Sequence, residues 1–198
     1  MPTKERQEKI ERLIQQRQQG IMVFEDIHDP HNAAAVLRRC DGFGFHQAYF
    51  IFQDEKPYNP ARVGKSSSSS ANRWLQFKTF DSTKTCLESL RTEGYEIVAT
   101  ALTDKAENLF ESDFTQEKIA LVFGNEHRGV SDDVLALAHR VVKIPMTGMV
   151  QSFNLSVTAA LVMYEITRQR REQGLERYVY PPESQQYFQE VLLKREDK

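Results

Sequence analysis

The sequence predicts an α/β fold, a parallel sheet flanked by helices, and two observations favour it. Six short apolar runs recur from residue 21 onward: IMVF, AYFIF, WLQFKTF, EIVAT, KIALVF and VVKIP. Segments with helical spacing separate most of these runs, among them AAAVLRRC, STKTCLESLRTEG and SDDVLALAHR. Because alternating strands and helices are typical of parallel sheets, we expect the strands to be buried between two helical layers.

Local signals place the ends of the expected helices. Residues 4–18 form a predicted polar helix with three apolar residues on one stripe, which we interpret as an appendage. Pro30 marks the start of the second helix, and Gly42 is interpreted as its C-terminal cap. Gly94 ends the third helix, and the last helix begins after Pro182.

The chain of 198 residues is long enough for one well-packed domain. We expect an N-terminal helical extension over residues 1–18, a main domain over 19–173 and a C-terminal helical extension over 174–198. The net charge of −2 excludes a cationic surface overall, so a nucleic-acid partner would require local basic patches. Cys40 and Cys86 lack a paired spacing and the N-terminus is charged, so we predict a cytoplasmic protein without a disulfide framework or signal peptide.

An uncharged stretch, IPMTGMVQSFNLSVTAALVMY, covers residues 144–164. A membrane span needs about 20 continuous apolar residues, whereas Pro145, Gly148 and several polar residues interrupt the first half of this stretch. We therefore predict a buried strand that ends near Pro145, a tight loop through Gly148, and a core helix that opens between Ser152 and Asn154. The helix itself could pack either in the core or on a partner chain.

The candidate site lies in the loops after EIVAT, KIALVF and VVKIP, because ligands of open parallel sheets bind beyond the carboxyl ends of the strands. The loop after KIALVF has Gly124 and Gly129 at its ends and charged residues between them. The common dinucleotide and phosphate-loop fingerprints are missing. His28 and His31 lie close together, but no second cluster of histidine or cysteine accompanies them, so we predict no metal site.

Three segments resemble, in order and spacing, the motifs of a known family: HNAAAVLRRCDGFGF, LVFGNEHRGVS and IPMTGMVQSFNLSVTAAL. They are similar to the three motifs of the SpoU-type (TrmH-like) RNA ribose 2′-O-methyltransferases of the SPOUT superfamily. The stretches VFEDIHDPHN and VATALTD, with the two short helical extensions, look most like the branch that methylates a guanosine in the D-loop of tRNA. Phe153 stands where that family usually has leucine, which is a conservative change.

The resemblance implies a C-terminal deep trefoil knot, a homodimer, and S-adenosylmethionine as the cofactor, held by the loops of the knot. The residues that match the family's cofactor contacts, or neighbour them, are Thr100, Gly124, Ile144, Met149, Ser152 and Phe153. The family's catalytic arginine corresponds to Arg38, with Asn32 beside it. A guanidinium stays protonated near neutral pH, so we interpret Arg38 as an electrostatic partner of the developing alkoxide or of a phosphate, and the base as a phosphate oxygen or water.

Glu126 and Asn154 are expected to position the substrate or the loops, and a carboxylate that caps nearby amides is an equal alternative for Glu126. The candidate RNA contacts are basic: Arg39, Lys65, Arg73, Lys78, Arg168, Arg170 and Arg171. The serine run at residues 66–70 is either a flexible loop or part of a basic arm that orders on phosphates. The alternatives are an rRNA ribose methyltransferase, a knotted RNA-binding module without activity, and an α/β protein that binds an unspecified small ligand.

Overall fold

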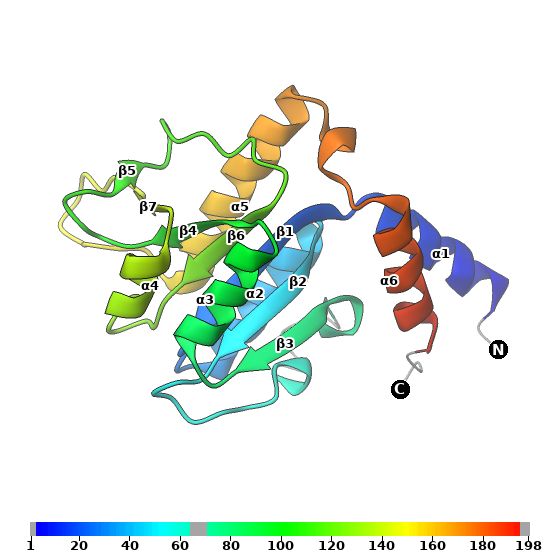
Figure 1. Ribbon diagram of the computed structural model, residues 1–198, viewed down its shortest axis with the longest axis horizontal. Coiled ribbons are helices and arrows are strands. Elements are labelled where there is room, and N and C mark those ends of the chain that lie inside the picture. Colours follow the sequence, from blue (N-terminus) through cyan, green and yellow to red (C-terminus); the bar gives the residue numbers. More distant parts are fainter. Residues whose placement is uncertain (1–2, 64–70, 195–198) are drawn as a thin grey trace.

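The computed structural model describes residues 3–63 and 71–194. Within these residues, the centre of the molecule is a seven-stranded parallel sheet in the order β3-β2-β1-β6-β4-β7-β5 (Figure 1). The strands are β1 Gln18–Glu25, β2 Phe45–Ile51, β3 Gln76–Phe80, β4 Glu96–Thr100, β5 Glu107–Asn108, β6 Ile119–Phe123 and β7 Arg140–Lys143. The parallel sheet flanked by helices that the sequence predicts is confirmed.

Helices cover both faces of the sheet. Successive residues of the central strands point to opposite faces, so each strand contributes to two core layers. Met22 and Phe24 of β1 pack in the core layer that holds α2 (Pro30–Gly42) and α5 (Leu155–Glu172). Ile21 and Val23 pack in the layer that holds α3 (Thr83–Thr92) and α4 (Asp132–Leu137). Strands β1, β2, β4 and β6 are therefore buried on both sides, as their continuous hydrophobicity predicts. The expected burial is wrong for the edge strand β3 and incomplete for β7, whose residues are mostly only partly buried.

Strand β6 lies in the middle of the sheet although it comes late in the chain. Its residues 120–123 pair with 21–24 of β1, and its residues 119–122 pair with 96–99 of β4. All five residues of β6 are buried. Strand β6 therefore joins β1 to β4, which do not pair with each other.

The first and last helices pack against each other at one side of the molecule (Figure 1). Helix α1 (Lys4–Gln15) contributes Ile10 and Ile14, and α6 (Pro182–Lys194) contributes Phe188 and Leu192 to a separate small core. Tyr180 joins this core from the segment before α6. The expected N-terminal helix ends earlier than predicted, because the chain enters β1 at Gln18.

Several expected element ends are wrong by a few residues. The helix predicted from SDDVLALAHR ends at Leu137, since His139 already donates its backbone N–H to Ile97 of β4 as the chain enters β7. Gly42 is the last residue of α2 and not its cap, and Gly44 adopts the left-handed conformation with φ 82°. No apolar run or turn signal predicts the short β5. The same is true of the 3-10 turns η1 Pro60–Arg62, η2 Ala71–Trp74 and η3 Leu175–Tyr178.

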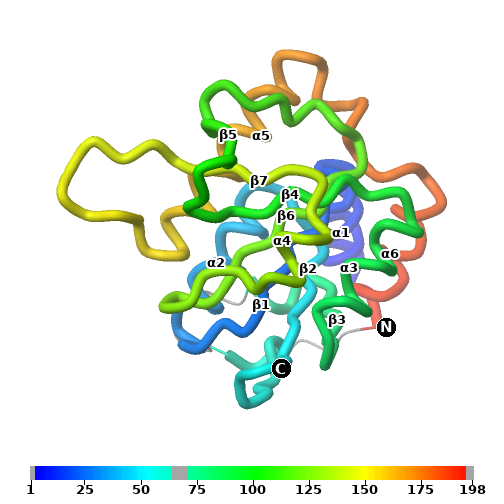
Figure 2. The backbone as a smooth tube through the Cα atoms, turned by 60° about the vertical axis from the view of Figure 1, so that its left-hand side comes forward, coloured from blue at the N-terminus to red at the C-terminus, as the bar shows by residue number. Residues whose placement is uncertain are grey.

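The uncharged stretch folds into a strand end, a loop and a helix, in the predicted order. The prediction of a tight loop through Gly148 is wrong, since residues 147–154 are all exposed. Asn154 caps α5, accepting a hydrogen bond from the backbone of Ser156. In Figure 2 the loop between β7 and α5, coloured yellow, projects from the body of the molecule. Along α5, Ala159 and Ile166 are buried whereas Val157 is 40% exposed. The helix thus packs in the core along one face, as one of the two expected alternatives describes, while packing on a partner chain stays a prediction.

The C-terminal half of α5 is held beneath the segment that precedes β6. Gln169 donates to the carbonyl of Ser112 (2.8 Å) and accepts from the backbone N–H of Phe114 (2.8 Å). Arg170 is fully buried and donates to the backbone carbonyls of Gln116 and Gln19. Arg170 therefore anchors the fold, and its expected role as an RNA contact is wrong.

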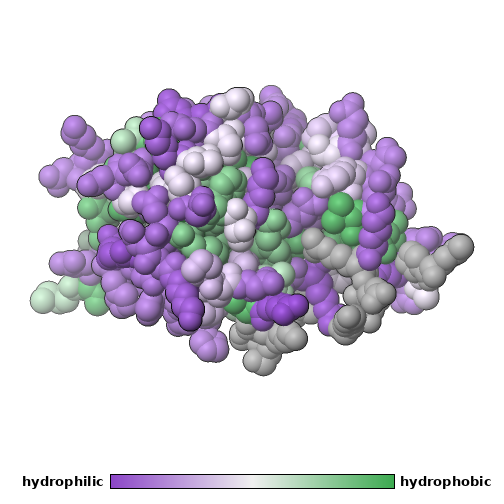
Figure 3. All heavy atoms as spheres, turned by 60° about the horizontal axis from the view of Figure 1, so that its bottom comes forward, coloured by the Kyte–Doolittle hydropathy of each residue, from purple (hydrophilic) through white to green (hydrophobic). Residues whose placement is uncertain are grey.

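The face shown in Figure 3 mixes hydrophilic residues with smaller hydrophobic areas. Across residues 3–63 and 71–194, no helix is long and apolar enough to cross a membrane.

Candidate active site at the carboxyl edge of the sheet

A cavity of about 710 Å³ opens at the carboxyl ends of β4, β6 and β7. Its walls come mainly from three chain segments, residues 100–103, residues 124–130, and residues 142–144, 146 and 151–155 of the third, with Asn32 of α2 at one side. The three loops that the sequence marked as candidates therefore meet in one place. Backbone groups, apolar side chains and a few polar side chains share the lining, which is the usual character of a small-molecule site.

The loop after β6 is a tight backbone structure. Asn125 and Gly129 exchange two backbone hydrogen bonds of 2.9 Å, and the Asn125 side chain accepts from the backbone N–H groups of His127 and Arg128. A Cβ atom placed on Gly124 would lie 2.2 Å from the carbonyl carbon of Gly129. Only glycine fits at position 124, so the backbone of this loop forms the cavity wall without a side chain between.

Five of the six predicted cofactor residues line the cavity: Thr100, Gly124, Ile144, Ser152 and Phe153. The sixth, Met149, does not line it and is fully exposed at the tip of the projecting loop, so its placement beside the cofactor is not supported by this chain alone. Thr100 donates its hydroxyl to the carbonyl of Val122 (3.2 Å), which links the ends of β4 and β6.

Glu126 joins the second segment to the start of α2. Its carboxylate accepts from the backbone N–H groups of His28 (2.9 Å) and Asp29 (3.2 Å), and from the side-chain amide of Asn32 (2.9 Å). Burial acts to raise the pKa of Glu126, but these hydrogen bonds to the charged form outweigh it and lower the pKa. The expected alternative, a carboxylate that caps nearby amides, therefore describes Glu126 in the structure.

Both the nitrogen and the oxygen of the Asn32 side-chain amide form hydrogen bonds. Its nitrogen donates to Glu126 (2.9 Å), and its oxygen accepts from the side chain of Asn154 (3.1 Å). Asn154 in turn caps α5. A chain of hydrogen bonds, Glu126 to Asn32 to Asn154, thus connects the three matched segments around the cavity and fixes the orientation of the Asn32 amide.

Arg38 is not brought to this cavity. It is exposed and lies outside the lining, whereas Asn32 belongs to it. The two residues are six positions apart on α2, which places Arg38 about 9 Å farther along the helix and about 120° around it. Because α2 starts at the carboxyl edge and runs away from it, the expected placement of Arg38 beside Asn32 is not found within one chain.

The candidate RNA contacts lie apart from the cavity. Arg168 is paired with Glu165 (2.7 Å) and Glu172 (2.6 Å) of its own helix, and Arg39 donates to the carbonyl of Ala35 (2.5 Å). Arg73, Lys78 and Arg171 are exposed. Lys65 and the serine run fall outside the described residues, so the basic arm stays a prediction.

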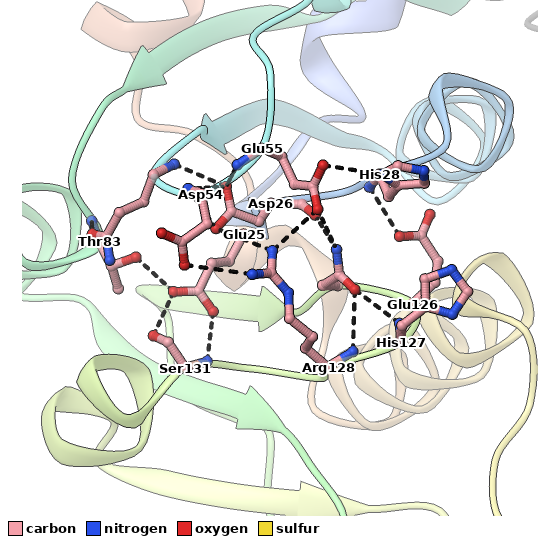
Figure 4. A network of polar contacts seen from close by, with 12 residues as sticks. Glu25, Asp26, His28, Asp54, Glu55, Thr83, Glu126, His127, Arg128 and Ser131 are labelled. Atoms are coloured by element: carbon pink, nitrogen blue, oxygen red, sulfur yellow. Dashed lines mark hydrogen bonds and ion pairs between the residues drawn. The ribbon is translucent and has the colours of Figure 1, made fainter.

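A polar network beside the cavity had no signal in the sequence. It joins Asp26, Asp54 and Glu55, at the ends of β1 and β2, to Arg128 in the loop after β6 (Figure 4). Among the described residues, no group of three or more histidine, cysteine or acidic side chains has the arrangement of a metal site.

Comparison with known proteins gives consistent results. The family described as SpoU rRNA Methylase matches residues 19–164. The tRNA (guanosine(18)-2′-O)-methyltransferase of Thermus thermophilus is 36% identical over 191 residues, covering 96% of this chain and 95% of the relative. The enzyme of the same name from Escherichia coli is 36% identical over 164 residues, covering 82% of this chain and 69% of the relative.

Solved structures have the same fold. The A. aeolicus TrmH/SpoU tRNA modifying enzyme has a TM-score of 0.85 and 29% identity, covering 96% of this chain and 94% of that chain. The SpoU methyltransferase AviRb from Streptomyces viridochromogenes, solved in complex with the cofactor AdoMet, has a TM-score of 0.67 and 26% identity. That match covers 78% of this chain and 59% of AviRb.

Proposed function

This chain belongs to the SpoU rRNA methylase family, and we propose that it transfers a methyl group from S-adenosylmethionine to the ribose 2′-hydroxyl of a guanosine in the D-loop of tRNA. Relatives of almost equal length that are named tRNA (guanosine(18)-2′-O)-methyltransferase support this substrate. The observation that carries the proposal is the cavity, at which the three matched segments bring Asn32, Glu126 and Asn154 together. A tRNA substrate is consistent with the expected cytoplasmic location, which stays a prediction.

The residues around the cavity fit S-adenosylmethionine. The position of Gly124 keeps one wall free of side chains, so an adenine ring can contact backbone groups directly. Thr100, Ile144 and Phe153 would surround the cofactor, with Ser152 at its polar side. When bound, the cofactor supplies a methyl group that is activated by its positive sulfonium.

Methyl transfer to a ribose oxygen requires alignment of the two reactants, and alignment alone can lower a barrier by about 7–11 kcal/mol. Asn32 is suited to this task because both ends of its amide are fixed, by Glu126 and by Asn154. A phosphate oxygen or water would accept the proton of the 2′-hydroxyl. A guanidinium beside the oxygen would stabilise its developing negative charge.

Arg38 can supply that guanidinium if a second copy of the chain brings it to the cavity, because it does not reach the cavity of its own chain. We therefore propose a homodimer in which each cavity is completed by Arg38 of the partner. Large apolar side chains beside the cavity are available for such an interface: Leu102 is 57% exposed, Phe110 65% and Val150 64%. Their burial would stabilise the dimer.

The deep trefoil knot is likewise part of the proposal. Supporting it, α5 passes beneath residues 112–117 and is bonded to their backbone by Gln169 and Arg170. In a knot of this kind, the loops that bind the cofactor would be held together by the crossing of the chain itself.

The test is methylation of defined RNA by the purified protein with S-adenosylmethionine. We expect one 2′-O-methylguanosine per tRNA transcript, located in the D-loop by mass mapping of nuclease fragments. A transcript in which that guanosine is replaced by adenosine is the matched substrate control and should stay unmodified.

Other outcomes would overturn the proposal in distinguishable ways. Methylation of ribosomal RNA but not of tRNA would make the protein an rRNA ribose methyltransferase. Binding of tRNA without calorimetric binding of S-adenosylmethionine would make it an RNA-binding module without activity.

A further inference from the structure

We propose that Glu55 is a positioning residue for methyl transfer. It holds the loop after β6 and the loop before α2 in the arrangement in which Glu126 accepts the hydrogen bond from the side-chain amide of Asn32. The inference rests on the proposed function and names a further residue for the same site. Glu55 lies in the turn after β2 and does not line the cavity. Its effect would therefore pass through other residues, and the contacts between them can be followed one by one (Figure 4).

Asp26 fixes the turn that carries Glu55. It is buried and has a positive φ of 51°, a conformation that few residues other than glycine adopt. Its carboxylate accepts from the backbone N–H groups of three successive residues, Gln53, Asp54 and Glu55, at 2.8–3.1 Å. The backbone of Glu55 is consequently held at the carboxyl edge by the residue that ends β1.

The two carboxylate oxygens of Glu55 contact different loops. One oxygen accepts from the guanidinium of Arg128 (3.1 Å), with the side-chain amide of Asn125 at 3.4 Å. The other lies 3.0 Å from Nδ1 of His28. Glu55 therefore bridges the loop after β6 to the segment that leads into α2.

Both arms of this bridge end at Glu126. His28, on one arm, donates its backbone N–H to Glu126 (2.9 Å). Arg128, on the other arm, is two residues beyond Glu126 in the same tight loop. Glu126 then bonds Asn32, so Glu55 controls from two sides the position of the carboxylate that orients this amide.

The charges around His28 favour its protonated form and strengthen the bridge. Glu55 raises the pKa of His28, first through the hydrogen bond and then through its charge, and Glu126 and Asp29 act in the same direction, while burial opposes them. The ring of His127 lies edge-on to that of His28, with 6.1 Å between the ring centres. Loss of the Glu55 charge would weaken both the histidine arm and the arginine arm.

This bridge is better suited to local positioning than to global stability. The side chains of Arg128 and His28 are 50% and 62% exposed, and ion pairs as exposed as these contribute little to the free energy of unfolding. A change at Glu55 should therefore alter turnover more than the melting temperature. Glu55→Gln tests this, because the amide keeps the shape of the side chain and removes its charge.

The experiment is a double-mutant cycle between Glu55→Gln and Glu126→Gln, measured as kcat and KM for RNA and for S-adenosylmethionine. In the otherwise unchanged protein, we expect Glu55→Gln to lower kcat about tenfold. In the Glu126→Gln background, the same substitution should lower kcat less than about twofold, because the residue through which it acts is already altered. Asp81→Asn, an exposed carboxylate at the same edge, is the matched control and should leave kcat unchanged.

Two outcomes would overturn the inference without touching the proposed function: equal effects of Glu55→Gln in both backgrounds, or a lower melting temperature with unchanged kcat. NMR titration of His28 gives a readout that needs no activity. Glu55→Gln should move the pKa of His28 down toward its ordinary value of 6.5, and an unmoved titration would contradict the bridge even if no RNA were methylated.

Discussion

The two sides of the cavity are built differently. On one side, Gly124 and the loop after β7 present mainly backbone and small or apolar groups. On the other, Asn32, Glu126 and Asn154 present side chains that are bonded to one another. The backbone side has no room for an added atom at Gly124, whereas the side-chain network can lose a group and relax. A change at Gly124 should therefore strongly weaken cofactor binding, and changes in the network should lower kcat more gradually.

The largest effect is expected from Gly124→Ala. Its Cβ would overlap the backbone of Gly129, which cannot move without breaking the hydrogen bonds between Asn125 and Gly129. We expect the Kd for S-adenosylmethionine, measured by calorimetry, to rise on the order of 100-fold or more.

Gly148→Ala is the matched control for Gly124→Ala. It adds the same methyl group to the neighbouring loop, but nothing lies within 4 Å of the new atom. Its Kd should stay within about twofold of the original. Equal behaviour of the two variants would show that the overlap at Gly124 is not what weakens binding.

The next largest effect is expected from Arg38→Ala. Arg38 belongs to neither side of the cavity of its own chain. We expect kcat to fall on the order of 10²–10³-fold, the usual effect of one lost transition-state donor, with the Kd for S-adenosylmethionine unchanged. Single-turnover methylation at the original rate would refute the role.

Mixing two inactive variants tests whether Arg38 acts across the dimer. Arg38→Ala retains the cavity and Gly124→Ala retains the arginine, so a mixed dimer would contain one complete site. After exchange of subunits, we expect about a quarter of the original activity, since half of the dimers are mixed and each has one site. Failure to recover activity, with exchange verified by mass, would place Arg38 within its own subunit.

A smaller effect is expected at Asn154, which belongs to the side-chain network and caps α5. Asn154→Ala should lower the free energy of unfolding by about 1 kcal/mol through loss of the cap, and kcat by roughly three- to tenfold. Asn154→Ser keeps a capping oxygen but is too short to reach Asn32, so it should lower kcat equally at nearly full stability. A serine variant with unchanged kcat would show that the link to Asn32 is dispensable.

The smallest effect is expected on the free energy of unfolding at acidic pH. The folded protein lowers the pKa of Glu126 below its ordinary value of 4.5, so its hydrogen bonds stabilise the folded state above that pH and are lost as pH falls through the folded pKa. Glu126→Gln should therefore flatten the decline in the free energy of unfolding below about pH 4.5, as measured by urea titration at several pH values. Parallel curves for the two proteins would contradict this linkage.

The loops around the cavity could be located from the sequence, whereas the contact between Glu55 and Arg128 beside it could not. Gly124, Ile144 and Asn154 follow apolar runs or open a helix, and such signals are local. The contact between Glu55 and Arg128 spans 73 residues. Because neither residue differs locally from any other charged residue in a loop, only the folded arrangement reveals the pair.

The errors in the predicted fold have the same origin. Strand β5 has two residues and no apolar run, and it forms because β7 offers Val142 and Lys143 for pairing. Arg170 looks like one more basic residue at a helix end, yet tertiary packing buries it among backbone carbonyls. The misplacement of Arg38 is different, since the spacing from Asn32 already implied divergent directions on one helix.

The central place of β6 has a consequence for synthesis of the protein on the ribosome. Strands β1 and β4 both pair with β6, at residues 119–123. The middle of the sheet therefore cannot form before these residues have left the ribosome. Long-range strand pairing of this kind slows folding and leaves edges open to aggregation in the meantime. The nascent chain should therefore depend on chaperones over its first 120 or so residues, and should gain protease resistance only after β6 is available.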